Sequence, residues 1–143
     1  MNRMERLLKL RRHESDMAAV AMRRAQEKAS EAEAATQAAR ERRREAESRM
    51  TAAAGRPQSS VHFLQQRFEV LERLDEERLQ DIQERRLQRA LNMRRGDLQH
   101  AMVREEQMRH LDDLEKRRRQ AAEMGSEQKT LDDIRREGGT RPW

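Results

Sequence analysis

The side chains that could do chemistry in this sequence are four histidines and several neighbouring carboxylates. His110 and Asp113 have the i, i+3 spacing of two metal ligands on one helix face. A zinc ion needs three or four ligands that converge on one point, and no second cluster accompanies this pair. The other histidines stand alone in the sequence; they are His13, His62 and His100. We therefore expect solvated histidines and no metal site.

The acidic pairs do not indicate catalysis either. Glu105-Glu106 and Asp112-Asp113 lie in a chain of which 41% is charged, so neighbouring acids are expected there without a catalytic role. The chain has no cysteine, and we find no glycine-rich phosphate-binding loop. A pair of packed helices, the architecture predicted below, encloses no shielded pocket of the kind that catalysis needs. We expect no enzyme activity, no catalytic residue and no cofactor.

Two basic runs could contact nucleic acid. They are Arg42-Arg43-Arg44 and residues 116–119, in a chain with a net charge of +5 and a pI near 10.5. Acidic residues flank both runs, whereas nucleic-acid binders present a face of one sign, often with stacking aromatic rings. The mixed charge favours a solvated or protein-facing surface, and hence no nucleic-acid partner. The alternative is a basic coiled coil associated with nucleic acid or ribosomes.

The elements that must position these residues are helices. Only 34% of the 143 residues are hydrophobic and 2% aromatic, which is too little for one globular core. Two prolines and five glycines, among abundant alanine, leucine, glutamate and arginine, favour helix over disorder. No apolar run approaches the ~20 residues that span a bilayer, and the first residues do not resemble a signal peptide. We predict an all-α, soluble chain that forms a single coiled-coil domain over 1–143.

A seven-residue repeat of small apolar side chains predicts the first helix, over residues 3–54. Seven positions of one register are apolar, and only Arg11 breaks the series. A repeat of seven keeps an apolar stripe on a left-handed supercoil. The register comprises Met4, Ala18, Ala25, Ala32, Ala39, Ala46 and Ala53, and positions three or four further on supply Leu7, Leu8, Ala21, Met22, Ala29, Ala35 and Met50. Alanine buries little surface, so we expect a low melting temperature.

Residues 55–60 have the composition of a turn. Gly55 can serve as the left-handed residue just past the helix end, and Pro57 cannot continue a helix. Ser59 or Ser60 can cap the helix that follows. A connection this short makes neighbouring helices antiparallel.

The second helix is predicted over residues 61–124 and is longer than the first, so that its far part lacks a partner within the chain. Gly125-Ser126 leaves open whether it continues over 126–137, and residues 138–143 should fray. After the turn, its predicted seam continues through Leu79, Ile82, Leu87, Ala90, Leu91, Leu98, Ala101, Met102, Met108, Leu111 and Leu114. We therefore predict two long helices that form an antiparallel coiled-coil hairpin.

One apolar cluster follows the turn directly. It consists of Val61, Leu64, Phe68 and Leu71, which have the 3-4 spacing of a coiled-coil core. Phe63 and Phe68 differ by about 500° of helical rotation, so they cannot both point into one narrow seam. At least one ring should therefore be exposed, and an exposed ring on so polar a chain indicates a docking point. The cluster is either hairpin core or a docking surface, and both interpretations stay open.

Three sequence stretches resemble those of one protein family. Residues 106–117 (EQMRHLDDLEKR) are similar to a charged K-x-L-E-x-L-x-E-K-R stretch, and residues 127–134 (EQKTLDDI) to an E-Q-K-x-L-D-E ending. Gln65-Gln66, followed by Phe68, matches the pattern after the turn. These features and the predicted architecture resemble the FliJ proteins of the bacterial flagellar type III export apparatus and the YscO-like stalk proteins of injectisomes.

The resemblance implies a central stalk for an export ATPase. The end with both termini would enter the ATPase hexamer and promote its assembly and activity, and the turn end would bind the cytoplasmic region of the export-gate membrane protein. The family also handles export chaperones, and works in the cytoplasm at the inner membrane, which it reaches through its partners. The implied ATPase-binding residues are Leu7, Leu8, Leu111, Leu114, Gln128, Leu131 and Asp132. The implied gate-binding residues are Met50, Leu64, Phe68 and Leu71.

Overall fold

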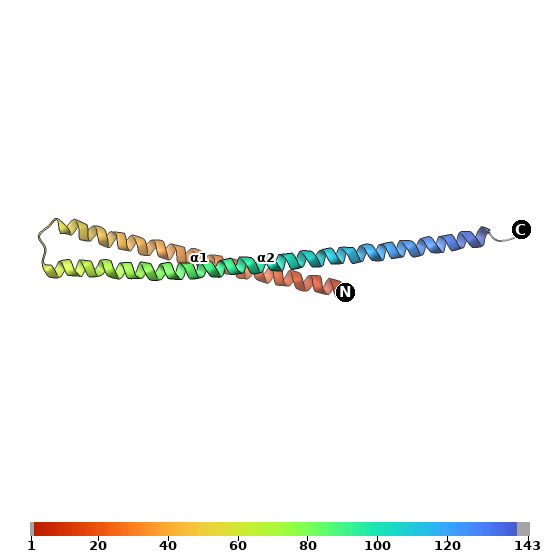
Figure 1. The fold of residues 1–143 in the computed structure, drawn as a ribbon, viewed down its shortest axis with the longest axis horizontal. Helices are drawn as coiled ribbons and strands as arrows, with labels where there is room; N and C mark the ends of the chain where they lie inside the picture. The colour runs from red at the N-terminus through yellow and green to blue at the C-terminus, as the bar shows by residue number, and fades with distance from the viewer. Residues whose placement is uncertain (1, 140–143) are drawn as a thin grey trace. The chain divides into compact units, whose positions relative to one another are not determined.

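The protein is a pair of long antiparallel helices joined by a short turn (Figure 1). The computed structural model describes residues 2–139. Helix α1 spans Arg3–Ala54 and helix α2 spans Ser60–Gly139. The predicted all-α hairpin is thereby confirmed. Of the predicted frayed tail, the two glycines 138 and 139 belong to α2, and residues 140–143 lie outside the described residues.

The chain divides into two compact units, each of which contains part of both helices. The turn unit comprises Met17–Gln99, and the terminal unit comprises Met1–Asp16 together with His100–Trp143. α2 passes through Gly125 without interruption. A glycine inside a helix costs about 1 kcal/mol relative to alanine, and α2 nevertheless continues for fourteen residues beyond Gly125.

Side-chain caps define where both helices begin. The amide of Glu5 donates to the side-chain oxygen of Asn2 over 2.8 Å, and the amide of Asn2 lies 3.3 Å from the Glu5 carboxylate. This reciprocal capping box was not anticipated from the sequence, although its N-x-x-E spacing could have revealed it. At α2 the amide of His62 donates to the hydroxyl of Ser59 over 3.1 Å. Of the two predicted capping serines, Ser59 is therefore the cap.

The turn differs from the prediction at Gly55. No glycine among the described residues has a positive φ, so the expected left-handed conformation of Gly55 is wrong. The amide of Arg56 instead donates to the carbonyl of Ala53 over 3.0 Å. This i, i+3 bond tightens the last turn of α1 with ordinary negative φ, and Pro57 then ends the helical path.

In the turn unit, α1 contributes an alanine-rich seam with the predicted seven-residue repeat. Ala39 is 0% exposed and Ala46 is 2% exposed. The seam positions, all buried or half-buried, are Ala18, Met22, Ala25, Ala29, Ala32, Thr36, Ala39, Arg43, Ala46, Met50 and Ala53. Strict spacings of three and four between them show that this face follows a coiled-coil partner.

The facing seam of α2 is more polar than predicted. Its buried or half-buried positions in the turn unit include Gln66, Val70, Arg73, Glu77, Gln80, Glu84, Leu87, Leu91 and Leu98. Leu79 and Ile82, predicted as seam residues, are 67% and 54% exposed, so that this prediction was wrong. The register follows the charged pairs described below, because alanine offers the large side chains of α2 little to pack against.

In the terminal unit the helices pair over a short length only. The seam combines Met4, Leu8, Arg11 and Ser15 of α1 with Ala101, Glu105, Met108, Asp112 and Glu115 of α2. The predicted seam residues Met102, Leu111 and Leu114 are 46–55% exposed there. Every residue of α2 from 116 to 138 is exposed. This unpaired extension, about 35 Å of helix, confirms that α2 continues beyond its partner helix.

Candidate interaction surfaces

An apolar stripe lies on α2 immediately after the turn. This turn-end stripe consists of Val61, Leu64, Phe68 and Leu71, which are 64%, 52%, 66% and 49% exposed. The stripe is therefore not hairpin core, and Phe63 is also exposed, at 40%. Phe68 follows the seam residue Gln66 by two positions, or about 200° of helical rotation. The stripe thus faces away from α1 and is free to meet another protein.

The structure separates Met50 from the other residues implied for gate binding. Met50 is a half-buried member of the α1 seam, whereas Leu64, Phe68 and Leu71 are on the outward face of α2. Met50 is placed to support the turn region. The three α2 residues share one exposed face.

Ion pairs across the seam hold the helices together beside this stripe. Arg43 is hydrogen-bonded to Glu77 on the opposite helix and to Glu47 on its own helix. Further pairs join Arg49 to Glu69 at 2.6 Å and Arg40 to Asp81 at 3.2 Å. The hydrogen bond to Glu77, followed by that to Glu47, raises the pKa of the Arg43 guanidinium above its ordinary value. The carboxylates that stabilise this cation sit on both helices, which fixes the register of α2 on α1.

A groove lies in the terminal unit where α1 begins. This terminal groove, of about 480 Å³, is lined by Met4 from α1 and by Leu111, Leu114, Glu115, Arg118 and Arg119 from α2. Leu111 and Leu114 are 48% and 46% exposed. The structure therefore brings these two of the implied ATPase-binding residues together on an apolar surface with a basic rim. Leu7 and Leu8 are half-buried on α1.

The rest of the implied ATPase-binding residues lie on the unpaired extension. Gln128, Leu131 and Asp132 are all exposed, and Leu131 is 58% exposed. Met124 and Ile134 add apolar surface at 70% and 59% exposure. Such exposed apolar side chains on an unpaired helix mark a surface that a partner can cover.

A buried carboxylate organises the start of this extension. Asp112 is 4% exposed and lies 3.1 Å from the ammonium of Lys116, one helical turn further on. This hydrogen bond is the largest cause that raises the pKa of Lys116 above its ordinary value. Glu5 of α1 adds the smallest contribution in the same direction.

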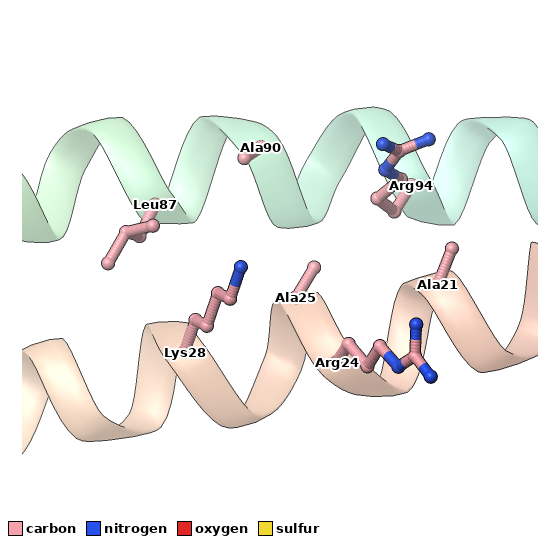
Figure 2. Close-up of a pocket in the computed structure, with 7 residues that line it drawn as sticks. All are labelled: Ala21, Arg24, Ala25, Lys28, Leu87, Ala90 and Arg94. Carbon is pink, nitrogen blue, oxygen red and sulfur yellow. The ribbon is translucent and has the colours of Figure 1, made fainter.

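A gap of about 300 Å³ interrupts the seam of the turn unit (Figure 2). The alanine gap has small apolar walls, and three cationic side chains surround it. Its lining residues are Ala21, Arg24, Ala25, Lys28, Leu87, Ala90 and Arg94. Figure 2 shows the ammonium of Lys28 in the space between the helices. The seven-residue repeat predicts Ala21 and Ala25 in the seam but not this opening, because a gap depends on what the facing helix supplies.

The described residues contain no group that would suit a metal ion. Among residues 2–139 no three or more histidine, cysteine or acidic side chains converge. Neither helix of the described part has a stretch apolar enough to cross a membrane. What the described residues offer are exposed apolar and charged faces on the two long helices of a coiled-coil hairpin.

Comparison with known proteins identifies the family. The model of the flagellar FliJ protein family matches residues 1–138. The chain therefore belongs to the FliJ family, as its sequence features predicted, and is a component of flagellar protein export. Searches of curated proteins and of solved structures gave no significant match.

Proposed function

We propose that this protein is the stalk of the flagellar export ATPase and couples the ATPase to the export gate. The terminal groove and the unpaired extension of α2 bind the ATPase hexamer and promote its assembly and hydrolysis. The turn-end stripe binds the cytoplasmic region of the gate protein. The protein also binds export chaperones and acts in the cytoplasm, at the membrane only through its partners.

The observation that carries this proposal is that each unit exposes an apolar surface which the hairpin itself does not need. In the turn unit, Phe68 is 66% exposed although it lies among seven-residue repeats typical of a helix partner. In the terminal unit, Leu114 lines the terminal groove and Leu131 is 58% exposed on the extension of α2. Two separate docking surfaces are what a coupling component requires.

The direct test adds the purified protein to the cognate export ATPase. We expect faster ATP hydrolysis and more hexamer, measured by phosphate release and by analytical ultracentrifugation. The double substitution L114A/L131A should weaken stimulation about tenfold, since buried apolar anchors of an interface contribute about 1.4 kcal/mol or more. If the wild-type protein changes neither hydrolysis nor assembly, the stalk role is wrong.

Phe68→Ala provides the matched control. It should leave ATPase stimulation unchanged and weaken binding to the cytoplasmic region of the gate about tenfold, as measured by isothermal titration calorimetry. L114A/L131A should show the opposite behaviour in both assays. Because all three side chains are about half exposed or more, the circular dichroism melts of both variants should match that of the wild type. An identical loss in both assays would contradict the division into two surfaces.

A further inference from the structure

Positive charge is concentrated in one section of the turn unit. Residues 17–30 of α1 and 85–96 of α2, here called the basic section, hold eight Lys or Arg residues and one acidic residue, a net charge of +7. The whole chain carries only +5, so all other residues together are slightly acidic. The eight cations are Arg23, Arg24, Lys28, Arg85, Arg86, Arg89, Arg94 and Arg95.

These cations are not neutralised by the chain itself. Within residues 2–139, neither Arg24 nor Lys28 forms an ion pair, and Arg94 has only the exposed Asp97 at 3.5 Å. No ion pair among the described residues crosses the seam between the two segments of the basic section. A concentration of unpaired cations costs folding free energy through repulsion, and a negatively charged partner would relieve that cost.

The alanine gap lies inside the basic section and gives the surface its shape. Ala21, Ala25 and Ala90 form apolar walls, and three cationic side chains stand around the opening (Figure 2). The volume of about 300 Å³ is larger than one large apolar side chain needs. On the same face of α1, Met17 precedes Ala21 by one helical turn and is 55% exposed.

We propose that the basic section is a docking site for an acidic amphipathic helix of a partner protein. Such a helix inserts one or two large apolar side chains into the alanine gap, against the alanine walls and beside Met17. Its flanking carboxylates pair with Arg24, Lys28 and Arg94. None of the residues assigned to the ATPase or to the gate belongs to this section, so the site is a docking surface separate from those two.

The chemistry of the site favours a protein over a nucleic acid. A phosphate backbone satisfies the cations but has nothing to place between the alanine walls. Single-stranded binders also use aromatic rings on which bases stack, and the basic section contains no aromatic residue. A helix is the fitting shape, because the lining positions 87, 90 and 94 and 21, 24, 25 and 28 repeat with helical spacing and can accept the ridge of a third helix.

The experiment uses the full chain and a fluorescein-labelled synthetic peptide. The peptide has three heptads with leucine at the a and d positions and glutamate at most others, and binding is followed by fluorescence anisotropy in 50 mM salt. We expect the triple variant R24E/K28E/R94E to bind at least tenfold more weakly than the wild type. A second peptide with glutamine in place of glutamate, and a third with alanine in place of leucine, should each lose at least tenfold. Equal binding of the three peptides would refute the proposal.

The matched control is R44E/R104E/R117E, which changes the net charge by the same amount outside the basic section. These three arginines are exposed and, within residues 2–139, form no ion pair. The control should bind the acidic peptide within about threefold of the wild type, because screening in 50 mM salt limits long-range charge effects to about 14 Å. A loss as large as that of the triple variant would mean that only net charge matters, which would overturn the site.

A variant that fills the alanine gap separates the contribution of the gap to peptide binding from that of the cations. Ala25→Leu keeps every cation but places an apolar side chain of the protein itself between the helices. We expect at least fivefold weaker binding of the acidic peptide together with a higher melting temperature by circular dichroism. Unchanged affinity would show that nothing enters the gap.

Two further measurements test alternative ligands of the basic section. A 20-nucleotide RNA that bound more tightly than the peptide, and lost affinity in the triple variant, would reassign the section to nucleic acid.

A second copy of this chain is another competing occupant, because its segment 60–84 is itself acidic and carries the turn-end stripe. Sedimentation at several protein concentrations tests whether the chain forms such a dimer. A dimer that the triple variant abolishes would reassign the section to self-association. We expect R24E/K28E/R94E to stimulate the ATPase as the wild type does. Loss of peptide binding would then concern the basic section alone and not the proposed stalk role.

Discussion

Two neighbouring sections of the turn unit use the same alanine stripe of α1 in different ways. The turn-proximal section, residues 31–54 and 60–84, holds eight basic and twelve acidic residues, a net charge of −4. There Ala39 and Ala46 are almost fully buried and ion pairs cross the seam. The basic section carries +7 and contains the alanine gap. Ion pairs thus cross the alanine seam in the turn-proximal section, whereas in the basic section no ion pair of the described residues crosses it and a gap lies beside the buried Ala29 and Leu91.

The comparison also explains the polar seam of α2. Glu77 lies at a seam position opposite Arg43, and Glu69 pairs with Arg49 at the edge of the seam. The apolar side chains of the turn-end stripe lie on the outer face. Charge-assisted hydrogen bonds are stronger and more directional than neutral ones, whereas alanine gains little from contact with a large side chain across a narrow seam. The arrangement that satisfies the charges leaves Phe68 available to a partner.

The largest effect is expected where the seam is closed. Ala39→Leu should lower the free energy of unfolding by about 2 kcal/mol, because Ala39 is 0% exposed and extra methyl groups would overpack the seam. Urea denaturation followed by circular dichroism measures the change. A neutral or stabilising result would mean that the seam can open there at no cost.

The same substitution in the basic section should have the opposite sign. Ala25→Leu places its side chain into the gap of about 300 Å³ and should raise the free energy of unfolding by about 1 to 2 kcal/mol, the transfer value of the buried methyl groups. Ala39→Leu in parallel is the control, as helix propensity changes equally in both variants. A destabilised Ala25→Leu protein would contradict the open gap.

A smaller stabilisation is expected from Gly96→Ala at the edge of the basic section. Gly96 lies inside α2 with no positive φ, and a methyl group there would meet no atom within 4 Å. The gain should be about 0.5 to 1 kcal/mol, because alanine restricts the unfolded chain and favours helix. A methyl group would also meet no atom within 4 Å at Gly125. The melting temperatures of Gly96→Ala and Gly125→Ala should therefore both rise, by similar amounts.

The smallest expected effect concerns the ion pairs. Glu77→Gln removes the carboxylate that bonds Arg43 across the seam, and should lower the melting temperature by a few degrees. Lys28→Gln, which breaks no ion pair of the described residues, should leave it unchanged or slightly higher. The difference should shrink in 1 M salt, since screening weakens both the attraction and the repulsion. Equal shifts for the two variants would remove the distinction between the sections.

The local elements were predictable because they depend on local chemistry. The helix limits near residues 54 and 60 follow from Pro57 and the Ser59 cap, and the alanine repeat follows from spacing alone. The Gly55 conformation was not predictable, because an i, i+3 bond from Arg56 competes with the left-handed end. Exposure of at least one ring near the turn was also predicted, and both Phe63 and Phe68 are exposed.

The sequence by itself determined that the chain is a helical hairpin of the FliJ family, with an alanine-lined first helix and an unpaired end to the second. Helix propensity, caps and repeats act over a few residues, so they can be read along the chain. Only the tertiary structure decided which face of α2 meets α1, and hence that the turn-end stripe, with Phe68, faces outward. It alone brought Lys28 and Arg94, 66 positions apart, to one gap. Such register depends on pairing between distant side chains, which sequence spacing within either helix does not contain.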